Sequence, residues 1–100
     1  SGVYVRDNFC MGTGNICSKV NFIAATDESE EPFSLVPFDG ILGLSLPQMA
    51  EGPAFSVLDQ LVAAGVLEES LFAVFFGNDG EDSEITFGKY RRESMQSDIF

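Results

Sequence analysis

The sequence contains no histidine and no tryptophan, and it has only five basic residues against sixteen acidic ones, a net charge of −11. Without histidine, catalysis by a Ser-His-Asp or Cys-His arrangement is excluded. Its two cysteines do not make a zinc site without further ligands, so we expect no metal and no cofactor. The scarcity of Lys and Arg argues against a nucleic-acid partner and against an anionic membrane surface. The acidic surface suits an acidic compartment, or it simply keeps the protein soluble.

Long apolar runs are also missing. None approaches the roughly eighteen residues that a transmembrane helix needs, so we expect no membrane-spanning segment. The start, Ser1-Gly2-Val3, lacks the charged region of a signal peptide, and the end, at 98–100, resembles the beginning of a strand. We therefore expect a segment of a longer chain. Ten Phe residues are many for a small domain to bury, so some of them are expected to face another part of a larger molecule, the alternative being a self-contained Phe-rich core.

Two runs rich in β-branched and aromatic residues, 3–11 and 16–25, flank the turn sequence Gly-Thr-Gly-Asn at 12–15. This pattern predicts a β-hairpin. Such a hairpin brings Cys10 and Cys17 within bridging distance, so we expect a disulfide and an oxidising compartment. The alternative is two buried free thiols. The acidic loop at 26–32 then ends the second strand.

The next segment, PFDGILGL at 37–44, places one carboxylate and two glycines in an apolar run. A near-continuous apolar run of this kind predicts a strand buried on both faces and closely approached by another backbone. Asp39 would then have to be hydrogen-bonded, paired or protonated. It is either a catalytic acid or, as we favour, a structural carboxylate that accepts hydrogen bonds from backbone N–H groups.

The remaining pattern predicts one amphipathic helix and two more strands. The helix is expected at about 54–64, with Pro53 in its first turn and Gly65 as its stop. Its apolar face should carry Phe55, Leu58, Leu61 and Val62. Strands are expected at 71–77 and 84–88, joined by the loop NDGEDS, whose acidic residues lack the spacing of an EF-hand. The fold class is therefore mostly β with one amphipathic helix.

These motifs together resemble the N-terminal lobe of the pepsin-like aspartic proteases. The resemblance is carried by PFDGILGL at 37–44, by the helix and strand at 55–77, and by SEITFG at 83–88. It implies that residues 1–100 are the second half of one β-barrel lobe, an incomplete domain whose partner is the remainder of the same protease. It also implies a polypeptide substrate and a secretory-pathway location, extracellular or in an acidic vesicle.

The resemblance also implies roles for single residues. Phe33, Phe38 and Ile41 would line the S1 and S3 pockets for substrate side chains. Structural roles would fall to Asp39, Gly40, Leu42 and Gly43. In this family the Ile41-Leu42-Gly43 element lies against the loop that carries a catalytic aspartate, and Gly43 would let that loop approach closely.

The sequence departs from the family pattern at the catalytic motifs. The family hydrolyses peptide bonds with two aspartates, each in Asp-Thr/Ser-Gly, that share a proton and activate water. Neither motif occurs here, and Met11 stands where a flap would have Tyr. The chain alone is therefore expected to be inactive. Phe87-Gly88-Lys89-Tyr90 and the paired cysteines are similar to the plasmepsin-like branch of parasite enzymes. The alternatives are a non-catalytic pepsin-fold binding module or pseudoprotease, and an independent small acidic β domain.

Overall fold

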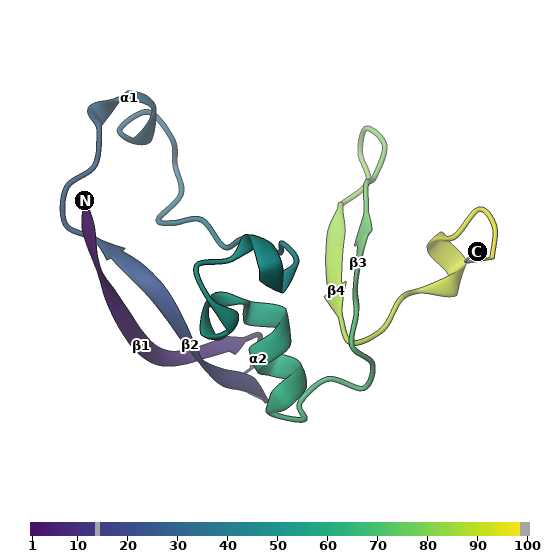
Figure 1. Cartoon of the computed structure of the whole chain (residues 1–100). Coiled ribbons are helices and arrows are strands. Elements are labelled where there is room, and N and C mark those ends of the chain that lie inside the picture. The colour runs from purple at the N-terminus through teal and green to yellow at the C-terminus, as the bar shows by residue number, and fades with distance from the viewer. Residues whose placement is uncertain (14, 99–100) are drawn as a thin grey trace.

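A computed structural model describes residues 1–13 and 15–98. The chain begins with a long β-hairpin (Figure 1). Strands β1 (Gly2–Met11) and β2 (Ile16–Ala25) pair antiparallel, with Gly2 opposite Ala25 and Met11 opposite Ile16. The predicted hairpin is confirmed, and the part of its turn that falls on Gly14 lies outside the described residues.

Cys10 and Cys17 are directly opposite each other in this register and are joined by a disulfide. Their Cα atoms are 4.1 Å apart. The predicted disulfide is therefore present, and it ties the two strands together next to the turn.

The predicted helix is present, but its beginning has a different geometry. A 3-10 turn, η2 (Pro53–Phe55), precedes the α-helix α2 (Val57–Ala63). Proline opens the turn because its missing N–H has no partner to lose at a helix start. Gly65, at φ 70°, ends the helix in a conformation that residues with a side chain rarely adopt.

α2 packs on the β1–β2 hairpin and forms the core there (Figure 1). Among the described residues the buried apolar side chains are Val20 of β2 and Val57 and Leu61 of α2. Val57 and Leu61 share a helix face because they are four positions apart. Val62, predicted to be on the buried face, is 38% exposed, so that part of the prediction is wrong. The partly buried residues around this core are Phe9, Met11, Ile16, Val66 and Leu67.

A second, shorter hairpin consists of β3 (Phe72–Phe75) and β4 (Glu84–Phe87), as predicted. Gly88 joins it to the loop that follows α2. Its N–H donates to the Leu71 carbonyl at 2.8 Å, and its carbonyl accepts from the Glu69 N–H at 3.0 Å. A Cβ at Gly88 would lie 3.2 Å from the backbone nitrogen of Glu68, and φ is 84°. Glycine is therefore required there both by conformation and by space.

The predicted strand in PFDGILGL is wrong. Residues 37–46 form no strand and run as an irregular segment between a one-turn helix, α1 (Glu30–Phe33), and the 3-10 turn η1 (Pro47–Met49). A strand needs a neighbour to accept and donate its backbone hydrogen bonds, and no strand within the described residues pairs with this segment. A further 3-10 turn, η3 (Arg92–Ser94), follows β4.

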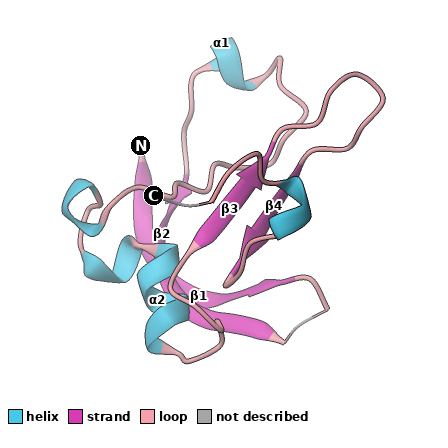
Figure 2. Ribbon diagram, turned by 90° about the vertical axis from the view of Figure 1, so that its right-hand side faces the viewer, coloured by secondary structure: helices cyan, strands magenta, loops and turns pink. Residues whose placement is uncertain are grey.

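The two hairpins stand apart, and α1 lies far from α2 in both views (Figures 1 and 2). The architecture is mostly strands with a few short helices, as the sequence predicts. The chain is open: its radius of gyration is 15.9 Å, whereas about 13 Å is usual for 100 residues. No helix in the described part of the chain has the length and apolar character needed to cross a membrane.

Candidate functional site

The candidate segment, residues 33–46, is anchored by short turns at both ends. At its start, α1 is closed by hydrogen bonds from the Ser34 N–H to the Glu30 carbonyl (2.7 Å) and from the Leu35 N–H to the Pro32 carbonyl (3.1 Å). At its end, the Met49 N–H donates to the Leu46 carbonyl at 2.9 Å. These turns position the ends of the segment, and its middle is left in an extended, irregular course.

The three residues predicted to bind substrate lie along this segment and are exposed. Phe33 is 37% exposed, Phe38 51% and Ile41 78%. None of them lines the hollow described below. They form an apolar edge that makes little contact with the rest of the described chain, and their pocket roles stay a prediction.

The residues predicted to be structural are also at the surface. Asp39 is exposed, and within the described residues its carboxylate makes no hydrogen bond or ion pair. The expectation that Asp39 is a buried carboxylate bound to backbone N–H groups is wrong for this chain, because the segment that carries it does not pair as a strand. Leu42 is 44% exposed. A Cβ placed on Gly40 or Gly43 would meet no atom of this chain within 4 Å.

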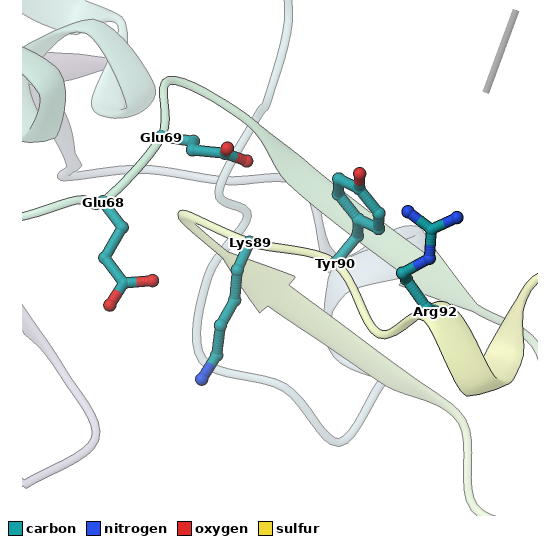
Figure 3. A pocket seen from close by; sticks show the side chains of 5 residues that line it. All are labelled: Glu68, Glu69, Lys89, Tyr90 and Arg92. Atoms are coloured by element: carbon teal, nitrogen blue, oxygen red, sulfur yellow. The ribbon is translucent and has the colours of Figure 1, made fainter. Parts of the chain in front are cut away.

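A hollow of about 430 Å³ lies elsewhere, beside the end of β4 (Figure 3). Its lining residues are Glu68, Glu69, Lys89, Tyr90 and Arg92. In Figure 3, Glu68 and Lys89 extend to one side of the backbone while Tyr90 and Arg92 extend to the other. The hollow is therefore a shallow, charged surface feature rather than a pocket in which groups converge on a substrate.

The neighbouring face of the β3–β4 hairpin carries the main charge network of the described residues. Arg91 pairs with Glu84 at 3.1 Å and with Glu93 at 3.0 Å. The hydrogen bonds from Arg91, to Glu93 and then to Glu84, raise the pKa of Arg91 above its ordinary value. A hydrogen bond from its own backbone, and then one from Arg91, lower the pKa of the Glu93 carboxyl. Both groups are therefore charged near neutral pH.

This basic segment is the feature that the sequence interpretation missed. Three of the five basic residues fall within positions 89–92, but the net charge of −11 conceals the cluster. Its signal is local charge patterning rather than composition. No group of three or more potential metal ligands occurs within the described ranges. The described arrangement thus offers an apolar edge and a basic turn, without a pair of catalytic carboxylates.

Comparison with known proteins identifies the family. The family model "Eukaryotic aspartyl protease" matches residues 1–100. Napsin-A of Mus musculus is 38% identical over 84 residues, which are 84% of this chain and 20% of the relative. Renin of Ovis aries is 34% identical over 76 residues (76% and 19%), and aspartic proteinase oryzasin-1 of Oryza sativa subsp. japonica is 33% identical over 91 residues (88% and 18%). The chain spans about a fifth of the length of these curated relatives. It belongs to the pepsin-like family of eukaryotic aspartyl proteases.

Proposed function

We propose that these residues are the second half of the N-terminal lobe of an aspartic endopeptidase. In this proposal the remainder of the same protease supplies the flap and two aspartates that share a proton and activate water for peptide hydrolysis. The present chain supplies scaffold and part of the wall for substrate side chains. Family membership and the absence of Asp-Thr-Gly and Asp-Ser-Gly from the sequence support this division of roles.

The observation that carries the proposal is the amount of surface that the chain leaves exposed. Its accessible area is 7957 Å². A folded monomer of 10.8 kDa exposes about 5500 Å² by the usual scaling with mass. The excess of about 2400 Å² is within the range buried by obligate interfaces. Contact with the remainder of the protease accounts for this excess.

The assignment of Phe33, Phe38 and Ile41 to the S1 and S3 pockets comes from the resemblance to the family, and the exposure of these side chains supports it. Several large apolar side chains exposed along one segment are typical of a surface that another group covers. A polypeptide substrate would cover them on one side. The open space beside Gly43 would admit the loop that carries a catalytic aspartate.

A secretory location, extracellular or in an acidic vesicle, is part of the same proposal. The disulfide between Cys10 and Cys17 is of the kind that persists in oxidising compartments. The net charge of −11 also suits an acidic vesicle, where protonation removes part of the repulsion among carboxylates. Membership in the plasmepsin-like branch stays a prediction, since the relatives compared above are animal and plant proteins.

The pocket assignment is tested in the complete protease with Phe38→Ala and Ile41→Ala. Loss of a few methylene contacts in an apolar pocket costs about 10- to 200-fold in kcat/KM. We expect a loss of this order for peptides with Phe at the cleaved position and a much smaller loss for peptides with Ala there. The matched control is Ile85→Ala, on the separate β3–β4 hairpin, which should leave both values unchanged.

Two results would contradict parts of the proposal. Equal losses for Phe and Ala peptides would remove these residues from the specificity pocket. A complete protein that binds peptides but lacks hydrolysis would be a pseudoprotease or binding module. The isolated chain should not cleave peptides at all, so pepstatin-sensitive cleavage by residues 1–100 alone would overturn the assignment of the aspartates to the remainder.

A further inference from the structure

The basic residues of this acidic chain are distributed very unevenly. Arg6 lies in β1 and Lys19 in β2, whereas the other three are in the four-residue run Lys89-Tyr90-Arg91-Arg92 that follows β4. The run therefore gathers three basic side chains at one exposed place, and two of them are paired with carboxylates. The run is not part of the apolar edge at 33–46 or of the proposed substrate pockets.

The run and the turn after it are accessible. The side chains of Arg91 and Arg92 are 51% and 71% exposed, and Lys89 is exposed as well. In Figure 1 the yellow turn η3 projects beyond the β3–β4 hairpin. The Arg92–Glu93 peptide bond lies at the start of η3, where attack by another protein's active site is not obstructed by a strand or by the core.

Within the described residues, the hydrogen bonds and ion pairs of this turn join positions that are close in the sequence. Ser94 N–H donates to the Arg91 carbonyl at 3.1 Å, and Met95 N–H donates to the Arg92 carbonyl at 3.0 Å. The ion pairs are Arg91–Glu84, Arg91–Glu93 and, at 2.9 Å, Arg92–Asp98. Exposed ion pairs and a single 3-10 turn contribute little stability, so the segment opens locally far more readily than the hairpins.

We propose that Lys89–Arg92 is a proteolytic processing site, cleaved after Arg92 by an arginine-directed endoprotease of the secretory pathway. An S1 pocket with a carboxylate at its base binds arginine, and further acidic subsites would bind Arg91 and Lys89. Water adds across the Arg92–Glu93 bond. The C–N bond breaks, the water oxygen completes a carboxylate on Arg92, and the Glu93 nitrogen takes up both protons of the water to become a new, charged amino terminus.

The position of the cut is compatible with an intact fold. Both hairpins, the disulfide and the buried Val57 and Leu61 lie before Arg92 in the chain. Cleavage therefore severs no described strand pair and removes no buried side chain. The product would be a two-chain protein whose structured elements are those described above.

The first test is the mass of the complete protein after secretion from a eukaryotic host. Denaturing, reducing mass spectrometry should show two chains, one beginning at Glu93. The Arg91→Gln/Arg92→Gln double variant should be secreted as one chain, whereas the matched control Arg6→Gln should be cut like the wild type. A wild-type protein that is secreted uncut, and that stays uncut after incubation with a purified dibasic-directed endoprotease, would overturn the proposal.

Limited trypsin digestion of the complete protein provides the second measurement, and its controls are within the chain. Because proteolysis follows the population of locally open states, cleavage at 91 or 92 should be at least about tenfold faster than at Arg6 or Lys19. Earlier cleavage at Arg6 or Lys19 would show that the segment is not accessible in the complete protein. Lys89→Gln separates simple exposure from recognition of the run: it should slow the dibasic-directed enzyme and leave trypsin unaffected at Arg92. If the dibasic-directed enzyme cleaves Lys89→Gln as fast as the wild type, recognition of the run is overturned.

Discussion

The isolated chain should lack a cooperative folding transition, because so much of its apolar surface has no partner. Of the roughly 2400 Å² of excess area, a little over half is expected to be apolar, as on protein surfaces in general. At about 25 cal/mol per Å² this is about 30 kcal/mol of missing burial, an upper bound because unfolded chains are themselves partly compact. Net stabilities of domains are only about 5–15 kcal/mol. The missing contribution therefore exceeds the whole margin by which a domain of this size is stable.

A urea titration of residues 1–100 beside the complete protease measures this effect. Far-UV circular dichroism should change gradually for the isolated chain, and a dye for exposed apolar surface should bind without denaturant. The complete protease should unfold in a steep transition under the same conditions. A sigmoidal transition of the isolated chain, with a slope of about 1–2 kcal/mol per molar urea and the same midpoint by tyrosine fluorescence, would refute the reasoning.

Three further predictions concern single groups. Leu61→Ala should destabilise the complete protein by about 3–5 kcal/mol, since Leu61 is fully buried. The control Asp79→Ala, in the exposed hairpin loop, should change the free energy of unfolding by less than about 0.5 kcal/mol. Comparable losses for the two variants would show that Leu61 is not part of the core. Gly80→Ala should lower the free energy of unfolding by about 1–2 kcal/mol because of its positive φ alone. Gly88→Ala should lower it by more, because its Cβ would also crowd the Glu68 backbone. A larger loss for Gly80→Ala in chemical denaturation would contradict the close approach of Gly88 to Glu68. The Glu93 carboxyl should titrate below its ordinary pKa in a carbon-detected NMR experiment, and Arg91→Gln should raise the midpoint of that titration. Because the pKa is lowered in the folded protein, the stabilising contribution of Glu93 is present above about pH 4.5 and is lost as the pH falls through the folded pKa. An unchanged midpoint in the variant would show that the pair with Arg91 does not lower the pKa.

The parts of the fold that depend on local signals could be predicted from the sequence. Two runs rich in β-branched and aromatic residues around a glycine-containing turn indicated the first hairpin, and the opposition of Cys10 and Cys17 followed from it. The helix was predicted at nearly the right bounds because Gly65 marks its end. Its buried face was less predictable: Val57 rather than Val62 joins Leu61, since the hairpin determines which side of α2 is covered.

The candidate site could not be predicted in the same way, for a physical reason. Apolar character creates a need for burial, but it does not specify the partner or the backbone conformation. Residues 37–46 are rich in apolar side chains that favour burial, but their pattern matches neither the period of a strand nor that of a helix. The segment therefore adopts no regular secondary structure. The basic run at 89–92 has the opposite character: its arginines make short-range ion pairs, and its three charged side chains are exposed.

These two segments therefore place different demands on the protein that contains them. The exposed edge at Phe38 and Ile41 is unfavourable in water, and in the proposed function it is covered by other residues of the protease and by substrate. The charged side chains of Arg91 and Arg92 are exposed to water, and covering them with apolar surface would be unfavourable, because charges are costly to remove from water. Assembly of the complete lobe should bury the first segment and leave the second accessible. With that separation, the proposed substrate-binding wall and the proposed cleavage site are compatible within one chain.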